Sequence, residues 1–351
     1  MTATTTTTTT TATTHTDVIP VTADDGTALN LHHVTGERPA SRGPVVLVHG
    51  AGVRADIFRP PGQPTLVDML VDDGWDVWLE NWRASIDLEP NRWNLDQAAV
   101  YDHPALIRAV LAETGADTVK AVVHCQGSTS FAMSAAAGLL PEVTTIVSNA
   151  VSLHPRVPGI SVVKGYTFTP IVERLTPYLS PRWGLDAPDL LAKVVVGLVR
   201  VTHRECDNIV CRMVSFTYGT GFPCLWSHEN LTDEIHDWIS GEFAEVPLAF
   251  FAQMTDSIRR GHMISVSGLP QLPRSFASGP PQTDARFVLF AGRDNRCFLP
   301  DSQEATFEFL DGHRRGYHAL HVVPGYGHLD MFFGERAHVD VFPQILEELA
   351  A

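Results

Sequence analysis

Three side chains that together could form a covalent catalyst stand at separate places in the sequence. Cys125 follows an apolar run and precedes Gly127 by two residues, and Asp294 and His328 each follow a later apolar run. A thiol can attack a carbonyl carbon once an imidazole takes its proton, and a carboxylate can hold that imidazole in the required tautomer. These residue types predict acyl chemistry, with Cys125 as nucleophile, His328 as base and Asp294 as orienting acid.

The segment around Cys125 partly matches the nucleophile-elbow pattern G-x-S-x-G. Cys125 occupies the serine position and Gly127 the last glycine, whereas Val123 replaces the first glycine. Small residues flank the nucleophile in this motif because its backbone is strained and the following helix packs tightly on the strand. Taken alone, the motif is equally compatible with a buried structural thiol, since free cysteine is among the most buried residue types.

Two backbone N–H groups are candidates for binding the oxyanion that forms in acyl transfer. Gln126 begins the predicted helix after Cys125, and Ala51 lies in the glycine-containing loop 49–52 after another apolar run. Backbone N–H groups at such positions can point at developing negative charge. We expect Gln126 and Ala51 to form the oxyanion hole.

Apolar runs and amphipathic segments alternate along most of the chain. The runs are typical of strands buried on both faces, and the segments between them show helical spacing. Such alternation predicts a doubly wound, mostly parallel α/β sheet, with catalytic groups at the carboxyl ends of its strands. The predicted strands are 44–48, 75–82, 118–124, 144–151, 286–290 and 318–323, after a hairpin at 17–34, and the predicted helices are 64–73, 101–113, 127–140, 301–312 and 337–350.

The alternation is lost between residues 152 and 282, where helical stretches, prolines and aromatic residues follow one another. We interpret 152–282 as a large, mainly helical lid inserted into a core formed by 17–151 and 283–351. Residues 1–16 are rich in threonine and lack the charged and apolar regions of a secretory signal, so we expect a disordered tail there.

Aromatic side chains of the lid could line an apolar substrate cavity or form the lid's own core. We take Trp226 and Phe222 as candidates for substrate contact. His228 could contribute a polar group to the same site, although a solvated lid edge is the more frequent place for such a histidine.

The composition excludes several functional classes. The chain has 351 residues with 25 basic and 40 acidic side chains, which gives a formal charge of −15. This charge opposes broad binding to nucleic acid or anionic lipid, because both require a clustered cationic surface. The longest apolar stretches, such as 194–201, are far shorter than the ~20 residues that span a bilayer. We expect a soluble, cytoplasmic protein, and the composition leaves its oligomeric state open.

No metal or cofactor is expected from the sequence motifs. The five cysteines form no C-x-x-C pair, and neither H-E-x-x-H nor a phosphate-binding loop is present. Cys206 and Cys211 stand five residues apart on a predicted helix, a spacing that does not place their thiols side by side. We therefore expect two separately packed thiols rather than a disulfide.

Together these features resemble the α/β-hydrolase superfamily from about residue 17 onward. The order nucleophile, acid, base along the chain is the order found in that superfamily. The segment His-Leu-Asp-Met-Phe-Phe-Gly at 328–334 is similar to the histidine segment of acid lipases. The resemblance is carried by 45–52, 75–85, 101–104, 122–127 and 327–334.

Three further segments look like the hydrolase-type region that accompanies some GMC-type cholesterol oxidases. They are 124–128, 205–212 and 226–231. No G-x-G-x-x-G opens the chain, so it has no flavin region and the oxidase activity does not carry over. In the roles of its residues, the Cys-His-Asp set is also similar to polyhydroxyalkanoate synthases, Dieckmann cyclases and dienelactone hydrolases.

The resemblance implies a cofactor-free enzyme for a small-molecule acyl substrate. Thioester acyl-enzymes are readily attacked by nucleophiles other than water. Our first interpretation is therefore an enzyme that takes an acyl group from a thioester, on coenzyme A or an acyl carrier protein, and releases it by transfer or by cyclisation, including Dieckmann-type closure. The alternative is a carboxylester or lactone hydrolase for a bulky apolar substrate, which the acidic net charge favours because carrier proteins are usually acidic too. A third interpretation is an inactive hydrolase fold that serves as a binding module.

Overall fold

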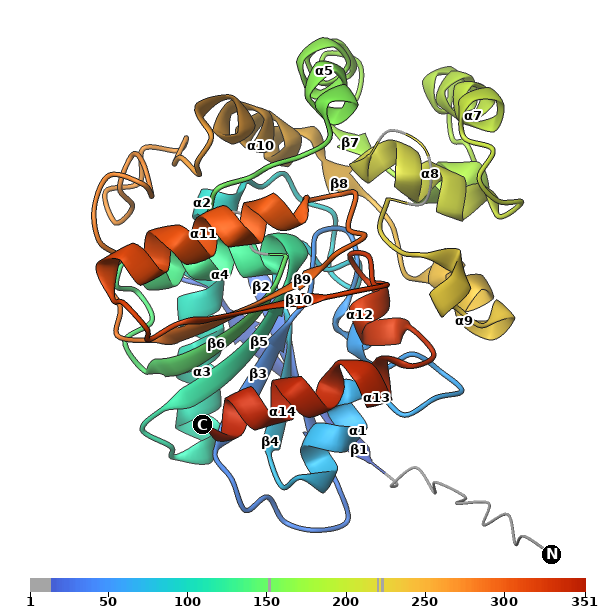
Figure 1. The fold of residues 1–351 in the computed structure, drawn as a ribbon. Helices are drawn as coiled ribbons and strands as arrows, with labels where there is room; N and C mark the ends of the chain where they lie inside the picture. Colours follow the sequence, from blue (N-terminus) through green and yellow to red (C-terminus); the bar gives the residue numbers. More distant parts are fainter. Residues whose placement is uncertain (1–13, 151–152, 220, 222–223) are drawn as a thin grey trace, which may run out of the picture.

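The structure is a computed structural model that describes residues 14–150, 153–219, 221 and 224–351. Its centre is an eight-stranded sheet in the order β1-β2-β4-β3-β5-β6-β9-β10 (Figure 1). The first two strands pair in antiparallel fashion, and the strands from β4 to β10 in this sheet run parallel. The strands are β1 (His15–Thr22), β2 (Ala28–Thr35), β3 (Pro44–Val48), β4 (Asp76–Asn81), β5 (Val119–His124), β6 (Val143–Asn149), β9 (Arg286–Gly292) and β10 (Ala319–Val323).

The central strands are buried on both faces, which explains their nearly uninterrupted apolar sequences. Every residue of β3 is buried, and in β5 only Lys120 is partly exposed. A parallel strand that is covered by helices on both sides has no solvent face and so shows no alternation of polar and apolar residues. The doubly wound, mostly parallel sheet predicted from the sequence is present.

Helices cover both faces of this sheet. α1 and α14 contact each other on one face, whereas α3, α4 and α11 lie on the other (Figure 1). The core helices are α1 (Leu66–Asp72), α2 (Leu95–Gln97), α3 (His103–Thr114), α4 (Cys125–Ala136), α11 (Pro300–His313), α12 (Asp330–Phe333), α13 (Ala337–Asp340) and α14 (Phe342–Ala350), with the single-turn elements η1 (Ala55–Phe58) and η2 (Ala98–Asp102).

Several helix boundaries differ from the prediction by a few residues, and two of the differences have a clear physical reason. The helix expected at 127–140 begins two residues earlier, at Cys125 itself. The helix expected at 337–350 is divided into α13 and α14, and Pro343 lies in the first turn of α14. Proline lacks the backbone N–H that would continue a helix across this point but fits the first turn of a new one.

The segment between β6 and β9 forms a cap over the carboxyl ends of the strands (Figure 1). Part of this cap has a small apolar core of its own, which includes Val195, Phe216 and Leu248. In the described ranges, no helix is both long and apolar enough to cross a bilayer. The cap contains α5 (Gly159–Thr167), α6 (Thr169–Val172), β7 (Tyr178–Leu179), η3 (Pro181–Gly184), α7 (Leu190–Thr202), α8 (Ile209–Tyr218), η4 (His228–Asn230), α9 (Asp233–Trp238), η5 (Ile239–Gly241), β8 (Val246–Pro247) and α10 (Leu248–Arg260).

The junction of β5 and α4 leaves no room for a side chain at Gly127. A Cβ at this position would lie 2.1 Å from the carbonyl oxygen of His49, which is backbone and cannot turn aside. We expect Gly127→Ala to lower the free energy of unfolding by about 1–3 kcal/mol, as overpacking of a core does. Chemical denaturation measures this change.

Gly197 provides the matched control, because it lies inside α7 with nothing within 4 Å of an added Cβ. Gly197→Ala should stabilise the protein by about 0.5–1 kcal/mol through helix propensity. Equal stabilities for Gly127→Ala and the unmodified protein would contradict the close approach of α4 to β3.

Candidate active site

Cys125 stands at the sharp turn between β5 and α4. Its backbone φ is 55°, in the left-handed region that residues with a Cβ rarely adopt. Val123, at the position where the motif has its first glycine, is fully buried in β5 and does not prevent this turn. The strained conformation expected of a nucleophile elbow is therefore present at Cys125.

Two backbone N–H groups meet at the Cys125 thiol. Those of Gln126 and Ala51 both donate toward its Sγ, so the two predicted oxyanion donors lie together. Gly50 permits this approach, because a Cβ there would lie only 2.9 Å from the Cβ of Cys125. Burial raises the pKa of Cys125 to about 12, and the two N–H groups oppose this only in part. The resting thiol is consequently neutral at pH 7.

Two buried imidazoles adjoin this thiol. The Sγ of Cys125 and one ring nitrogen each of His124 and His328 lie within 4.8 Å of one another. Burial lowers the pKa of His328 to about 3, and burial together with the neighbouring His328 lowers the pKa of His124 well below its usual range. Nε2 of His328 has no hydrogen-bond partner within the described part of the chain. His328 is therefore a neutral ring beside the sulfur, with one nitrogen available for proton exchange.

Asn295, and not Asp294, contacts the imidazole of His328. Nδ2 of the buried Asn295 donates to Nδ1 of His328 over 3.1 Å. The Asp294 side chain is exposed, and its backbone N–H donates to the carbonyl oxygen of Tyr326. The two residues are neighbours on the turn after β9, and their side chains leave that turn on different sides. The expectation that Asp294 orients His328 is therefore corrected.

The other hydrogen bonds of Asn295 decide which nitrogen of His328 carries the proton. Its Oδ1 accepts from the backbone N–H of Cys297 at 2.9 Å and from that of Phe298 at 3.1 Å. The amide nitrogen must then face His328, and an amide nitrogen only donates. Nδ1 of His328 is thus the acceptor, and Nε2 carries the proton of the neutral ring. Base catalysis by Nε2 requires the other tautomer.

The loop that carries His328 is fixed by Asp330. The Asp330 carboxylate accepts from the backbone N–H of Gly327 at 2.9 Å, from that of Ser227 at 3.1 Å and from Nδ2 of Asn230 at 2.7 Å. Burial raises the pKa of Asp330 to about 6, although these hydrogen bonds oppose the rise. Ser227 and Asn230 belong to the cap, so the cap helps to position the histidine loop.

An apolar cavity of about 90 Å³ lies in the cap close to this site. Phe168, Phe251 and Tyr218 are among its walls, together with Cys297. The hydroxyl of Tyr218 donates to the carbonyl oxygen of Ala51 over 2.9 Å, which connects the cavity to the oxyanion loop. The cavity is therefore placed to receive the apolar part of a substrate whose carbonyl lies at Cys125.

The same cavity is lined by one partly buried cation, Lys164. Nζ of Lys164 donates to the carbonyl oxygen of Gly219 over 2.7 Å and lies 4.3 Å from the ring centroid of Phe216. Burial lowers the pKa of Lys164 to about 8, a shift that the nearby Cys224 and Cys297 oppose. A largely apolar cavity thus has one cationic group among its polar side chains, and this group can fix the orientation of a ligand.

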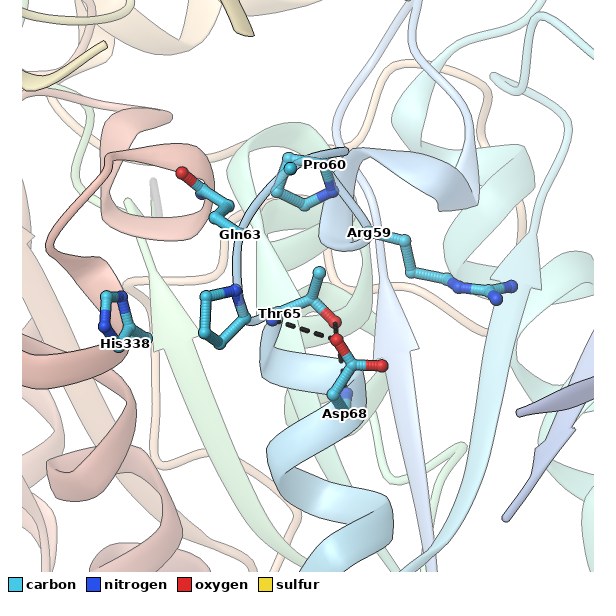
Figure 2. A pocket seen from close by; sticks show the side chains of 8 residues that line it. Arg59, Pro60, Gln63, Thr65, Asp68 and His338 are labelled. Carbon is cyan, nitrogen blue, oxygen red and sulfur yellow. Dashed lines mark hydrogen bonds between the residues drawn. The ribbon is translucent and has the colours of Figure 1, made fainter. Parts of the chain in front are cut away.

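A second pocket lies at the start of α1 and has different chemistry (Figure 2). Its acid, Asp68, accepts from the backbone N–H and the hydroxyl of Thr65 at 3.1 and 2.7 Å. These bonds form a capping box that satisfies the start of the helix. None of the residues that line this pocket has a thiol, and the hydroxyl of Thr65 is already engaged in the capping box. The pocket therefore has no free nucleophile comparable to Cys125.

The structure describes two of the three residues predicted to contact substrate, Trp226 and His228. Trp226 is buried against Phe243 and Phe333 and is not among the residues that line the apolar cavity. His228 lies beside Cys211, with its Nε2 3.4 Å from the Cys211 Sγ. Phe222 lies outside the described residues. Trp226 and His228 stay predicted substrate contacts, and in this structure their rings pack in the cap against Phe243 and Phe333 and beside Cys211.

The chain resembles lipases over most of its length. It is 26% identical to the lipase lipl-3 of Caenorhabditis elegans over 94% of this chain and 87% of the lipase, and 23% identical to a probable lipase of Schizosaccharomyces pombe over 94% and 76%. Sterol esterase 2 of Saccharomyces cerevisiae is 32% identical, but the match covers only 31% of this chain and 23% of the esterase. No protein-family model matches the chain.

Solved structures show which fold this sheet and cap represent. A thermophilic esterase from Thermogutta terrifontis superimposes with a TM-score of 0.56 over 95% of this chain and 98% of its own, at 15% identity. DcsB, solved with a substrate analogue, gives a TM-score of 0.61 over 96% and 99%, at 13% identity. The protein has the α/β-hydrolase fold.

Within the α/β-hydrolase fold, sequence reasoning missed two residues near the nucleophile. Asn295 stands one position after the expected acid, Asp294, on the same turn. It has no carboxylate, so the pattern of a catalytic acid does not point to it. Lys164 lies in a cap helix, and only tertiary packing places it at the cavity. Chain order indicated the turn after β9, and in the structure it is Asn295 on this turn that contacts His328.

The Asn295 contact predicts a gain of thiol reactivity when the amide becomes a carboxylate. In Asn295→Asp, one carboxylate oxygen can keep both backbone hydrogen bonds while the other accepts a proton from Nδ1 of His328. This should raise the pKa of His328 and favour the thiolate of Cys125, so alkylation of Cys125 by iodoacetamide at pH 7 should accelerate about tenfold or more. Peptide mass spectrometry of the alkylated protein measures the rate at this residue.

The pH dependence gives an independent check. In the unmodified protein the raised pKa of Cys125 means that its alkylation rate should still be increasing between pH 7 and pH 10, whereas the rate in Asn295→Asp should level off earlier. Asp294→Asn is the matched control and should leave both rate and profile unchanged, because this side chain is exposed. A response to Asp294→Asn but not to Asn295→Asp would restore Asp294 as the partner of His328.

Proposed function

We propose that this protein is a carboxylester hydrolase that forms an acyl-enzyme on Cys125. The observation that carries the proposal is the convergence of two backbone N–H groups on a sulfur held in a left-handed turn. Donors in this position can bind the oxygen of a carbonyl that the sulfur attacks. The neutral imidazole of His328 beside the sulfur is the base and acid that the reaction requires.

The reaction balances with these groups alone. In the tautomer that carries its proton on Nδ1, in which Asn295 no longer donates to that nitrogen, Nε2 of His328 accepts the thiol proton as Sγ of Cys125 bonds to the carbonyl carbon. The carbonyl oxygen becomes an oxyanion bound by Ala51 and Gln126. The bond from carbon to the alkoxy oxygen then breaks, and the leaving alcohol takes the proton from His328. Water, deprotonated by His328, attacks the thioester, and the acid leaves as Cys125 recovers its proton.

The proposed substrate is an ester with a bulky apolar acyl or alcohol part. Support comes from the apolar cavity that Tyr218 connects to the oxyanion loop, and from the likeness to lipases over 94% of the chain. Within this cavity Lys164 would meet a polar atom of the substrate. The sterol esterase match is too short to indicate which alcohol is released.

Acyl transfer from a thioester is the second candidate. The specific observation in its favour is the nucleophile itself, since a thioester acyl-enzyme can pass its acyl group to an amine or carbanion. In that case the donor would be coenzyme A or an acyl carrier protein, and release would occur by transfer or by ring closure, including Dieckmann-type cyclisation. The lipase matches favour the hydrolase.

Intact-protein mass spectrometry with a panel of esters and acyl thioesters tests the proposal. We expect the protein to gain one acyl mass with p-nitrophenyl esters of medium and long chains and to release free acid. Cys125→Ala should show neither adduct nor turnover, whereas Cys224→Ala, which removes another buried thiol, should behave like the unmodified protein. His328→Ala should slow acylation by about 10²–10⁴-fold, the usual contribution of a general base.

The products distinguish the candidates. Free acid from esters supports the hydrolase, and a transferred or cyclised product formed only from thioesters would replace it by the second candidate. An adduct that persists in Cys125→Ala would exclude Cys125 as the nucleophile. Absence of adduct and of turnover with every donor would leave the binding-module interpretation.

A further inference from the structure

Four side chains that can bind a metal ion lie together in the cap, apart from the catalytic cluster. They are Cys206, Cys211, His228 and His236, and their Sγ and ring-nitrogen atoms all lie within 4.8 Å of one another. Both thiols are free. The residues come from four different segments: the loop before α8, α8 itself, η4 and α9. Tertiary packing, and not a local sequence motif, therefore assembles the group.

This arrangement corrects the expectation that the two thiols pack separately. Cys206 precedes α8, which begins at Ile209, so the spacing of residues along a helix does not apply to the pair. The loop turns back and brings the sulfur of Cys206 to that of Cys211. The same fold brings His228 beside Cys211.

We propose that Cys206, Cys211, His228 and His236 bind one zinc ion in a tetrahedral Cys₂His₂ site. Two thiolates and two imidazoles are the ligands that zinc takes in closed structural sites. With Zn–S near 2.3 Å and Zn–N near 2.05 Å, a tetrahedral site has an S to N separation of about 3.6 Å. The Sγ of Cys211 lies 3.4 Å from Nε2 of His228.

One potential ligand atom of these four residues has no hydrogen-bond partner in the described part of the chain. Nε2 of His236 is buried and has no hydrogen-bond partner among the residues that the structure describes. Buried polar atoms are nearly always paired, because an unpaired one loses its hydration without compensation. A metal ion at the centre of the group would give this nitrogen its missing partner.

Asn208 fixes the backbone around the group. Its Oδ1 accepts from the backbone N–H of Cys211 at 3.2 Å and caps α8, while its Nδ2 donates to the carbonyl oxygen of His236 at 3.3 Å. The guanidinium of Arg212 donates to the carbonyl oxygen of Cys206. These bonds hold three of the four ligand-bearing residues before any ion binds, as second-shell groups do in metal sites.

Such a site would be structural, because four protein ligands leave no position open for water or substrate. Its effect would reach the catalytic loop through η4. His228 lies between Ser227 and Asn230, the two cap residues that bond Asp330 near His328. Zinc would thus fix the segment that positions the histidine loop, without taking part in the reaction.

Metal analysis of the purified protein tests the proposal independently of any activity. After expression in medium with zinc and dialysis without chelator, we expect about one zinc ion per chain by inductively coupled plasma mass spectrometry. Substitution by cobalt should produce the visible ligand-field bands of a tetrahedral ion and charge-transfer absorption from thiolate. Cys211→Ser and His236→Asn should each lose most of the bound zinc and the cobalt spectrum.

Two control variants test whether the zinc binds elsewhere in the protein. Cys125→Ala removes the sulfur of the catalytic cluster, and Cys224→Ser removes a buried thiol outside both clusters, so each should retain the zinc. Loss of zinc in Cys125→Ala with retention in Cys211→Ser would place the ion at the catalytic cluster and overturn the proposal.

The unmodified protein keeps the proposal testable even if the variants fail to fold. A thiol reagent should reach Cys206 and Cys211 faster after zinc is removed by a chelator, and the melting temperature should fall on that removal. A native mass 2 Da lower than that of the reduced chain, with Cys206 and Cys211 joined in one disulfide-linked peptide, would overturn the proposal. Zinc-free protein without a tetrahedral cobalt spectrum would do the same.

Discussion

The candidate site depends on one strained residue, Cys125, where β5 passes directly into α4. A left-handed backbone at this point turns the thiol out of the sheet and aims the N–H of Gln126 back at the sulfur. The turn is possible because α4 and β3 approach each other through Gly127, and because Gly50 leaves space for the Cys125 side chain. The strain is maintained by the surrounding packing, since strands on both sides of β5 pair with it along its length.

The imidazole of His328 is held in place by a second close backbone approach, between the end of β9 and the loop that carries His328. A Cβ at Gly292 would lie 1.9 Å from the carbonyl oxygen of Gly327, so the end of β9 and the histidine loop can meet only through glycine. This contact brings Asn295 and His328 together, and Asp330 then joins the loop to the cap through Ser227 and Asn230. The cap consequently helps to fix the loop that carries His328, the base in the proposed reaction.

The parts of this architecture that follow from the sequence are those with a strong local signal. Buried parallel strands such as β3 are continuous apolar runs, so the sheet could be predicted, and Cys125 lies where one such strand, β5, ends. Local pattern could not distinguish Asp294 from Asn295, because the choice depends on which side of a turn each side chain leaves. The group around His228 and Cys211 was also beyond prediction, since irregular loops assemble it and its spacing matches no zinc motif.

The electrostatics of the site indicate how charge moves during the proposed reaction. Burial disfavours both the thiolate of Cys125 and the imidazolium of His328, and Asn295 offers no negative charge to support the latter. A stable ion pair at rest, which reactive cysteines often form, is therefore not favoured here. The thiol proton must leave while the sulfur attacks, and the two N–H groups that contact the sulfur at rest are also placed to bind the oxyanion. Negative charge would then pass from sulfur to oxygen without leaving these donors, which explains how a buried neutral thiol could still serve as the nucleophile.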